Sequence, residues 1–459
     1  MAHVASEPGS FPGYRCSRCG TEYPPEPLTY TCPEDGANLD VLLDYAAVAR
    51  RASPQDIAAS PEGSIWRYLP LLPVGDPGLA GSALRSVGWT PLLKPPGLGE
   101  SLGLARLYLK DDGRNPTASF KDRASAVVVA RAREIGAEVV ITASTGNAGA
   151  ALAGMAAAAK LPAVILAPRS APQAKIAQLL IFGARVFLVE GTYDQAFDLS
   201  LQAAQVFGWY SRNTGHNPFT AEGKKTAAFE ICEQLTGHRP ATASTSPSRS
   251  AGGSLASPPA GRATGRASSG WLAPEAVFVS VGDGNIISGL YKGFQDLHAL
   301  GWIERLPRLY GVQSAGSAAV ANAFLAGAQE IRPVRAQTLA DSISVDLPRD
   351  GLRALRAVRE TGGAYLIVED AEILQAMATL GRQAAVFAEP AGAAGFAGLS
   401  AAVRQGLVER EERIVVLVTG SGLKDVPAAL QAVASAPVIE PSLQALQRAV
   451  EAGKLARHG

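Results

Sequence analysis

The sequence predicts an α/β fold of the doubly wound type, with two mostly parallel-sheet lobes and a small amino-terminal cap. From residue 105 onward, short β-branched runs alternate with helical patterns of about 10 to 15 residues. This alternation indicates parallel strands covered by helices on both faces. The chain has 459 residues, 47% of them hydrophobic, which is too large for one ordinary core, so we expect two lobes or more.

Composition limits the classes of molecule that the chain is expected to bind. The formal net charge is +1, with acidic and basic residues mixed along the chain, so no extended positive field is available for nucleic acid or an anionic membrane. A small-molecule ligand is therefore expected. The first ten residues lack a charged start followed by an apolar run, which predicts a cytoplasmic protein. The most apolar segment, Ala148 to Ala167, contains Lys160 and Pro162 and is typical of a buried helix followed by a strand.

Residues 1–45 are expected to form a zinc-ribbon-like cap. Cys16-Ser17-Arg18-Cys19-Gly20 and Cys32-Pro33-Glu34-Asp35-Gly36 have the layout of two knuckle turns, with Asp35 in the place of a fourth cysteine. A carboxylate can complete a tetrahedral zinc site, so Cys16, Cys19 and Cys32 are candidate zinc ligands. The alternative is a cap that keeps the turns and has lost the metal. The four cysteines of the chain do not suggest a disulfide framework.

The remaining chain divides by composition. Residues 46–104, rich in Pro and Gly, are expected to form an arm that packs on the main body. Residues 105–430 carry the alternating pattern of the main α/β domain. Within it, 238–270 has almost no large apolar residues and is expected to be a disordered surface insertion. Residues 431–459 are expected to form a helical tail with one amphipathic surface helix.

The pattern within 105–430 predicts individual elements. Strands are expected at Ala105–Lys110, Glu138–Thr142, Ala163–Ala167, Arg185–Val189, Trp209–Ser211, Ala276–Val281, Arg308–Val312, Ala364–Val368 and Arg413–Val418. Helices are expected from Phe120, Asn147, Pro172, Tyr193, Asn285, Ser317, Ala371 and Pro390, and over Thr220–Gln234.

Lys121 is the residue around which we interpret the site. Ser119 is a plausible N-cap, so Lys121 would lie in the first turn of a helix at the carboxyl end of a strand, where open α/β sheets bind ligands. A lysine in a partly dry, electropositive setting has a lowered pKa and can form a Schiff base. A solvated lysine at a helix start is the alternative, and the neighbouring motifs favour the reactive amine.

Three further strand ends carry small or polar residues. The turn Ser144-Thr145-Gly146-Asn147-Ala148-Gly149 would present backbone N–H groups to an anion, and Asn147 would add a side-chain hydrogen bond. Val281-Gly282-Asp283-Gly284-Asn285 would let a phosphate approach the backbone at a helix start. It fails the dinucleotide pattern, since the third glycine comes late and no acidic residue ends the next strand. Thr419 follows the last strand, and a hydroxyl at that position can hydrogen-bond a ring nitrogen of a ligand. Each of these turns alone is compatible with a purely structural role.

These four stretches, in this order, resemble the fold type II pyridoxal-phosphate enzymes, the tryptophan synthase beta-like group. Asn-Pro-Thr-x-Ser-Phe-Lys-Asp-Arg at 115–123 and Thr-Gly-x-Gly-Leu-Lys-Asp at 419–425 are similar to motifs of the threonine synthase family, and the resemblance covers roughly residues 85–430 apart from the insertion. The three-cysteine ribbon is also similar to the amino-terminal knuckle of some threonine synthases.

The resemblance implies a role for each candidate residue. Lys121 would form the Schiff base with pyridoxal 5′-phosphate and act as general base, and Asn147 would bond the ring oxygen of the cofactor. Thr419 would face its pyridine nitrogen. The residues that would hold its phosphate are Val281, Gly282, Asp283, Gly284 and Asn285. The residues that would bind the substrate are Ser144, Thr145, Asn147 and Lys224.

The implied reaction converts O-phospho-L-homoserine and water to L-threonine and phosphate, a carbon–oxygen lyase reaction of amino-acid biosynthesis. A homodimer is implied as well.

Two departures bear on the substrate. The family has glycine where this chain has Ala118, and it has a phosphate-binding arginine where this chain has Thr220. Losing a bidentate guanidinium removes a charge-assisted contact worth roughly 1.5–3 kcal/mol, although Lys224 or Arg212 can compensate.

Two alternative functions therefore stay open. One is a β-replacement or β-elimination enzyme acting on phosphoserine, serine or threonine, similar to cysteate synthase or a dehydratase. The other is a non-catalytic relative that binds a phosphorylated ligand.

Overall fold

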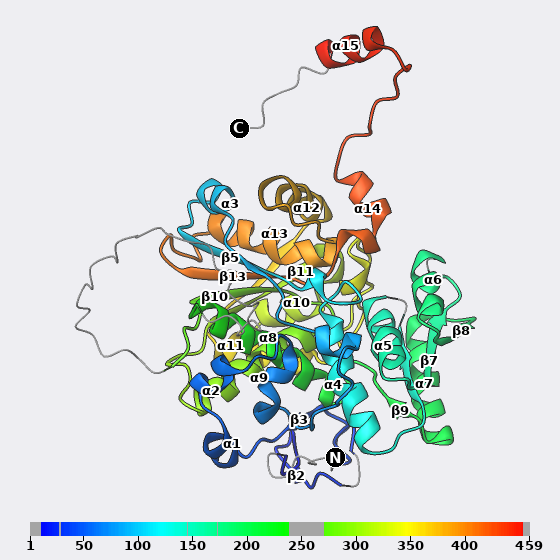
Figure 1. Ribbon diagram of the computed structural model, residues 1–459, viewed down its shortest axis with the longest axis vertical. Helices are drawn as coiled ribbons and strands as arrows, with labels where there is room; N and C mark the ends of the chain where they lie inside the picture. Colours follow the sequence, from blue (N-terminus) through cyan, green and yellow to red (C-terminus); the bar gives the residue numbers. More distant parts are fainter. Residues whose placement is uncertain (1–10, 27–28, 145, 172, 238–269, 453–459) are drawn as a thin grey trace, which may run out of the picture.

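The computed structural model describes residues 11–26, 29–144, 146–171, 173–237 and 270–452 (Figure 1). Three sheets organise it, and their strand orders are β2-β1-β3, β12-β11-β10-β13-β5-β4 and β8-β7-β6-β9. The expected disordered insertion lies outside the described residues except for Gly270. None of the helices in the described ranges is long and apolar enough to cross a membrane.

The elements have the following bounds. The strands are β1 (Tyr14–Cys16), β2 (Glu22–Tyr23), β3 (Leu39–Val41), β4 (Leu92–Leu93), β5 (Arg106–Asp111), β6 (Val140–Ala143), β7 (Ala163–Pro168), β8 (Arg185–Val189), β9 (Tyr210–Ser211), β10 (Ala276–Ser280), β11 (Arg308–Ser314), β12 (Tyr365–Val368) and β13 (Arg413–Val418). The α-helices are α1 (Tyr45–Arg51), α2 (Pro54–Ala59), α3 (Pro96–Ser101), α4 (Lys121–Glu134), α5 (Asn147–Ala158), α6 (Gln173–Ile181), α7 (Tyr193–Phe207), α8 (Phe219–Leu235), α9 (Asn285–Ala299), α10 (Ala319–Leu325), α11 (Gly351–Glu360), α12 (Asp370–Ala384), α13 (Pro390–Arg404), α14 (Val426–Gln431) and α15 (Leu443–Ala452).

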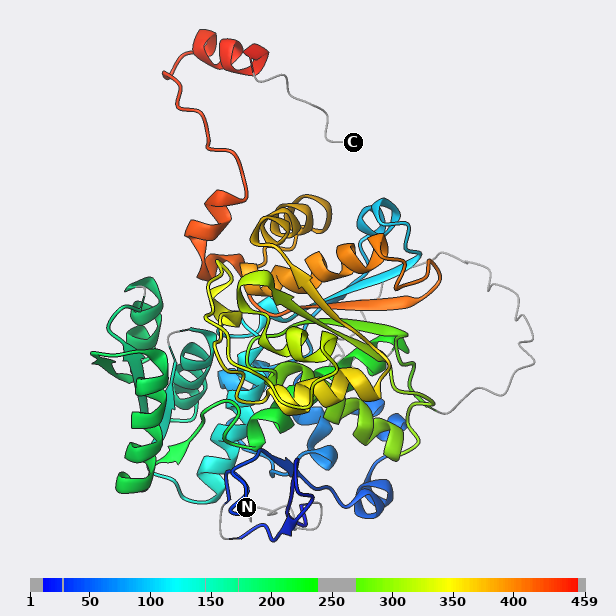
Figure 2. The same cartoon turned by 180° about the vertical axis from the view of Figure 1, so that it is seen from behind.

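The six-stranded sheet is the centre of the larger lobe. All its strand pairs are parallel except the short β4, which pairs antiparallel with β5. Along β10, Val277 and Val279 join one core cluster, whereas Ala276 and Phe278 join the cluster on the opposite face. Helices α12 and α13 cover one face, and α8 to α11 lie on the other (Figures 1 and 2). Burial on both faces explains why these strands are nearly continuous apolar runs.

The four-stranded sheet forms the smaller lobe, and all its pairs are parallel. Its strand β6 also faces two cores, because Val140 and Ile141 belong to different clusters. Helix α7 begins with a capping box in which Thr192 and Gln195 bond each other's backbone N–H groups, and it ends at the left-handed Gly208. The predicted α/β class with mostly parallel lobes is therefore confirmed.

Buried ion pairs fix helix α4 to its neighbours. Arg123 donates to Asp112 from Nε at 2.6 Å and to Glu230 of α8 from Nη1 at 2.6 Å, and all three side chains are fully buried. Lys110 of β5 pairs with the same Glu230 at 2.8 Å. Removing one partner of such a buried set leaves an uncompensated charge, so this network holds the start of α4 firmly against the larger lobe.

One local expectation was wrong, and one helix was not predicted. Ser119 is not the N-cap of α4, because the helix begins after Phe120 without any side-chain cap, and the buried Ser119 hydroxyl has no hydrogen-bond partner in the part of the chain that the structure describes. Instead, Phe120 N donates to Thr419 O at 2.9 Å, so the residue that follows strand β13, rather than a serine, fixes the helix start. Helix α11 was not expected, although its register of apolar residues is clear once Asp350 marks its beginning.

Candidate active site

A cavity of about 340 Å³ lies between the two parallel sheets. Its walls come from the segments after β5, β10 and β13 of the larger lobe and after β6 and β8 of the smaller one. Carboxyl ends of parallel strands from two sheets therefore face one space, which is the usual ligand position in open α/β sheets. The predicted site residues that line it are Lys121, Ser144, Asn147, Lys224, Val281, Gly282, Asp283, Gly284, Asn285 and Thr419. Thr145 lies outside the described residues.

Lys121 is the first residue of α4 and its side chain reaches this cavity. Burial lowers the pKa of its amine to about 8, while the negative charge of Glu389 opposes that change. The following two residues of the motif hold the helix in place: Asp122 accepts a bond from Thr117 N at 2.6 Å, and Arg123 belongs to the buried ion network. The motif thus supplies one reactive amine and its anchors.

The turn that precedes Lys121 contains Ala118, which has a left-handed conformation with a φ of 61°. An alanine is strained there, whereas glycine is not. This explains in physical terms why glycine suits this position in the family motif. The conformation is fixed on both sides, because Ala118 N donates to Asn115 O at 2.8 Å and Ser421 N donates to Ala118 O at 3.1 Å.

Asn147 begins helix α5 and contacts a carboxylate across the cavity. Its Nδ2 donates to Glu389 Oε1 at 2.6 Å and, more weakly, to Ser342 Oγ at 3.4 Å. Burial raises the pKa of Glu389, and Lys424, Asn147 and Lys121 act in the opposite direction. The strong bond to Glu389 fixes the Asn147 amide, while the long bond to Ser342 leaves one N–H that a ligand oxygen can take.

The glycine loop after β10, residues 281–285, has no room for a side chain at its two glycines. A Cβ on Gly282 would lie 2.8 Å from Ile343 Cα, and one on Gly284, which has a φ of +93°, would lie 2.7 Å from Asp350 O. The loop leads into the 15-residue helix α9, whose start has no side-chain cap. The free N–H groups and the positive end of the helix dipole favour a phosphate there.

Two further buried basic residues, Lys224 and Arg212, lie near Lys121. Burial, followed by the positive charges of Lys121 and Arg212, holds the pKa of Lys224 well below its usual range. Burial lowers the pKa of Arg212 to about 10, and its Nη2 is buried with no hydrogen-bond partner among the described residues. Lys224 Nζ donates to Asn285 Oδ1, in the loop after β10. Two buried lysines with lowered pKa values and a guanidinium nitrogen that can still donate indicate a site that favours anions. Together with the glycine loop, they fit a phosphorylated cofactor.

The remaining predicted contacts are weaker or structural. Thr419 lines the cavity, and its Oγ1 lies 3.5 Å from Ala391 O. Thr220 is fully buried in α8, where its Oγ1 donates to Asn217 O at 2.7 Å. His216 stacks on Tyr30 with ring centroids 4.7 Å apart, and burial lowers its pKa to about 4, so it is a neutral structural residue.

The cavity residues that sequence reasoning missed include Glu389, Tyr193 and Ser342. Tyr193 follows β8 as Asn147 follows β6, so the rule that ligands bind at strand ends could have identified it. Glu389 precedes Pro390, which is the first residue of α13. A carboxylate at a helix start is common for reasons of capping alone, so this signal was not specific. Ser342 lies in a segment without periodicity.

Comparison with known proteins agrees with the geometry. The family model described as pyridoxal-phosphate dependent enzyme matches residues 83–256 and 267–420. The chain belongs to this family and is a pyridoxal-phosphate-dependent lyase. Within the family it is 36% identical to the threonine synthase of Methanocaldococcus jannaschii over 436 residues, covering 95% of this chain and 98% of that one. The chain therefore belongs to the threonine synthase family.

Other relatives are consistent with this assignment. The threonine synthase of Methanosarcina acetivorans is 33% identical over 95% of this chain and 98% of its own length, and that of Synechocystis is 34% identical over 88% and 93%. Among solved structures, a threonine deaminase from Solanum lycopersicum superposes with a TM-score of 0.59 at 21% identity, covering 82% of this chain and 96% of that chain. This structural likeness supports the fold alone.

Proposed function

We propose that the protein converts O-phospho-L-homoserine and water into L-threonine and phosphate. The observation that carries the proposal is a group of buried basic residues at one cavity, in a chain that matches threonine synthases along nearly its whole length. Lys121 and Lys224 line the cavity, and Arg212 contacts it through Thr214, a lining residue that accepts a hydrogen bond from Arg212 Nη1. Both cofactor and substrate bring a phosphate to the site. A glycine loop suits one phosphate, and an unpartnered buried arginine suits the other.

The cofactor would be held by residues on four strand ends. Lys121 would attach to its aldehyde, the 281–285 loop would hold its phosphate, and Asn147 and Thr419 would bond its ring oxygen and ring nitrogen. When bound, pyridoxal phosphate supplies a conjugated ring that accepts the electron pair left by a departing proton. The start of helix α9 supports this arrangement, because it has no side-chain cap and its N–H groups are available to a phosphate.

Lys121 would also move the protons of the reaction. Its Nζ, when not attached to the cofactor, would take the proton from the α-carbon of the substrate. A pKa of about 8 leaves a useful fraction of the amine neutral near pH 7. Glu389, buried and fixed by Asn147, provides the negative charge that stabilises Lys121 each time it becomes protonated.

Arg212 is our candidate for the substrate phosphate, in place of the arginine that Thr220 replaces. Its Nε donates to Ser125 Oγ at 3.2 Å and its Nη1 to Thr214 Oγ1, which leaves Nη2 available. Thr214 lines the cavity. A charged, oriented guanidinium beside the cavity would restore the charge-assisted contact that the sequence lacks at position 220.

Phosphate release from O-phospho-L-homoserine tests the function. The wild type should release phosphate, whereas Lys121→Ala should lose at least about a thousandfold in kcat because base and cofactor anchor are both removed. Arg212→Gln should raise KM while keeping cofactor absorbance. Lys94→Ala, at an exposed lysine, is the matched control. Full absorbance with no phosphate release by the wild type would contradict the proposal.

We also propose that the protein is a homodimer and that two copies pair through the carboxyl-terminal segment. Helix α15 lies away from the body at the end of an extended stretch (Figures 1 and 2). Leu443, Leu446 and Val450 lie on one face of it with exposed fractions of 68%, 48% and 41%. An apolar helix face of this kind is usually covered.

We also propose that the chain divides into a cap, an arm, a catalytic domain and a tail, with boundaries after residues 45, 104 and 430.

A further inference from the structure

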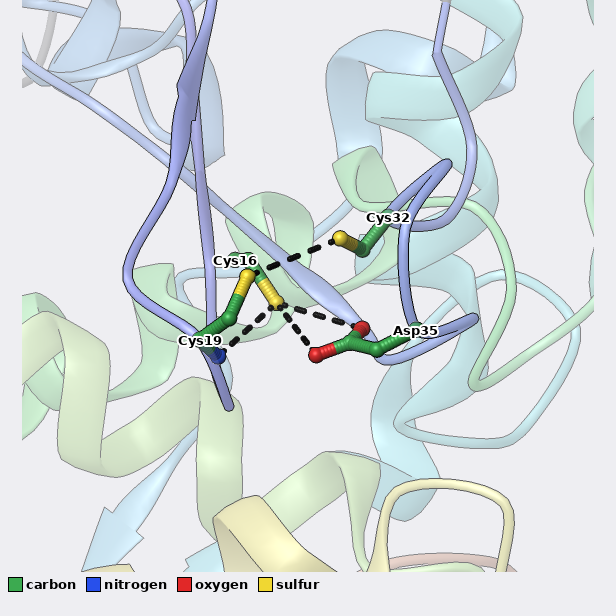
Figure 3. Close-up of side chains that lie close together, drawn as sticks. All are labelled: Cys16, Cys19, Cys32 and Asp35. Carbon is green, nitrogen blue, oxygen red and sulfur yellow. Dashed lines mark hydrogen bonds between the residues drawn. The ribbon is translucent and has the colours of Figure 1, made fainter.

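Four potential ligands converge in the amino-terminal cap. Cys16 ends β1 and Cys19 lies in the turn after it, and Cys32 and Asp35 come from the turn before β3. Figure 3 shows the two turns facing each other with the three sulfur atoms and the carboxylate pointing into the space between them. One ligand atom of each residue lies within 4.8 Å of all the others.

The spacing of these atoms matches a tetrahedral zinc site. With Zn–S bonds of about 2.3 Å, two ligand sulfurs lie about 3.8 Å apart, and with a Zn–O bond of about 2.1 Å, a sulfur and an oxygen lie about 3.6 Å apart. The distance from Cys19 Sγ to Cys32 Sγ is 3.8 Å. Cys16 Sγ lies 3.5 Å from both carboxylate oxygens of Asp35.

The two turns repeat one backbone design. Gly20 N donates to Cys16 O at 3.2 Å, and Gly36 N donates to Cys32 O at 2.9 Å. Both glycines have positive φ, 78° and 68°, so each turn closes in the same way after a first cysteine. Asp35 occupies in the second turn the position that Cys19 occupies in the first. This equivalence identifies Asp35 as a ligand that replaces a cysteine.

Surrounding donors orient the ligands. Arg18 N and Cys19 N point at Cys16 Sγ from 3.3 and 3.4 Å, and the Tyr23 hydroxyl lies 3.1 Å from Cys32 Sγ. Ala37 N donates to Asp35 Oδ1 at 2.9 Å, which leaves Oδ2 for a metal. Donors of this kind fix metal ligands in place and offset the charge of thiolates.

We propose that Cys16, Cys19, Cys32 and Asp35 bind one Zn²⁺ ion in a closed structural site. Three thiolates select a soft divalent metal such as zinc over magnesium or calcium. Four protein ligands leave no open coordination position, so the ion would stabilise the fold of the cap and take no part in the chemistry of the cavity. The proposal does not depend on which substrate the cavity accepts.

The cap is attached to segments that form the phosphate loop. Arg353 of α11 donates from Nη1 to Asp40 at 2.8 Å and from Nη2 to Asp350 at 2.8 Å. Asp350 in turn accepts a bond of 2.6 Å from Asn285 Nδ2, in the glycine loop. Arg356 donates to Ser17 O, inside the first turn. A metal that stabilises the cap would therefore also stabilise the position of α11 and, through it, the loop at Asn285.

Metal content of the purified holoenzyme tests the proposal. Protein prepared with a thiol reductant and without chelator should contain about one zinc per chain by mass spectrometry of the elements. Replacement by Co²⁺ should give thiolate-to-cobalt charge transfer in the near ultraviolet and the strong visible bands of a tetrahedral site. Iron in place of zinc, a Cys19–Cys32 disulfide, or the absence of metal after incubation with zinc sulfate would each overturn it.

Substitutions locate the site. Cys16→Ser and Asp35→Asn should lose zinc or bind it at least tenfold more weakly, whereas Asp35→Cys, which completes a four-thiolate site, should bind it more tightly. Cys232→Ala is the matched control, because Cys232 is buried in the core of the larger lobe. Equal zinc in Cys16→Ser and Cys232→Ala would contradict the assignment. Should Cys16→Ser fail to fold, the Co²⁺ spectra of wild type and Asp35→Cys still show whether these residues bind the metal.

Chelation tests the structural role separately. Stripping zinc from the wild type should lower its thermal midpoint and weaken its affinity for added pyridoxal phosphate, and both effects should reverse when zinc sulfate is restored. Zinc that can be removed without any change in the thermal midpoint would contradict a structural site.

Discussion

Lys121 has a pKa of about 8 because burial penalises its charged form. An ordinary lysine with a pKa near 10.4 is neutral in roughly one molecule in two thousand at pH 7, whereas a pKa of about 8 raises that fraction to roughly one in ten. Only the neutral amine can attack an aldehyde. The rate of cofactor uptake by the apoenzyme should therefore rise with pH and level off above a midpoint near 8. Stopped-flow absorbance measures it, and a rate that keeps rising tenfold per pH unit above 9 would be inconsistent with this pKa.

Glu389 faces Lys121, and its negative charge raises the lysine pKa against the effect of burial. Glu389→Gln keeps an oxygen that can accept the Asn147 bond but removes the charge. We predict that the midpoint of cofactor uptake shifts to lower pH in this variant and that kcat falls about ten- to a hundredfold. Glu411→Gln, at an exposed position, serves as the control. An unchanged midpoint would show that Glu389 does not set the charge state of Lys121.

Sequence reasoning identified the single residues whose function can be inferred from their immediate neighbours in the chain. Lys121 and Gly282 stand out because a reactive amine and a bare phosphate loop require particular residue types at particular turns. Arg212 was weighed only as a substitute for the arginine missing at position 220, and Glu389 was missed, because the value of each depends on neighbours distant in sequence. The Ser119 cap was wrong for a related reason: a serine before a helix favours capping, but here Phe120 N donates to Thr419 O, just after strand β13, and the helix start has no side-chain cap.

Helices α4, α8 and α9 pack through glycines. A Cβ on Gly223 of α8 would lie 2.1 Å from Arg123 O, in the backbone of α4. Gly223→Ala should therefore push the two helices apart, lower stability by about 1–3 kcal/mol, and displace Lys121 from the cavity. Gly381→Ala is the control, because a Cβ there meets nothing within 4 Å and the position is inside helix α12. That variant should gain about 0.5–1 kcal/mol.

Denaturant unfolding monitored by circular dichroism measures both effects. Equal midpoints for Gly223→Ala and Gly381→Ala would mean that helix propensity, rather than close packing, determines the result. Cofactor absorbance of folded Gly223→Ala reports whether α4 has moved.

Elements were predictable where both faces of a strand are buried. The strand Arg413–Val418 has the expected bounds because its apolar run ends where the cavity begins. Helix α11 was not predicted, since a long irregular segment precedes it and gives no periodic signal. The short helices of residues 46–104, such as α1 and α2, depend on packing against the body, which composition does not reveal.

For the whole molecule, the separated position of α15 leads to a prediction about assembly. Replacing Leu446 and Val450 together with Glu should convert the proposed dimer to a monomer, because both lie on the exposed apolar face. Gln447→Glu changes the same helix at a polar position and should leave the assembly intact. Light scattering coupled to gel filtration gives the mass. A wild-type monomer, or an unchanged dimer in the double variant, would contradict pairing through this helix.

The central claim is that the cavity converts a phosphorylated four-carbon amino acid into threonine. Its most direct test is nuclear magnetic resonance of the products formed by the holoenzyme from O-phospho-L-homoserine, with O-phospho-L-serine, L-serine and L-threonine as parallel substrates. We predict threonine and inorganic phosphate in equal amounts from the first compound, and far slower turnover of the other three. Faster turnover of phosphoserine, serine or threonine to a keto acid or a β-substituted product, with O-phospho-L-homoserine left intact, would contradict the claim.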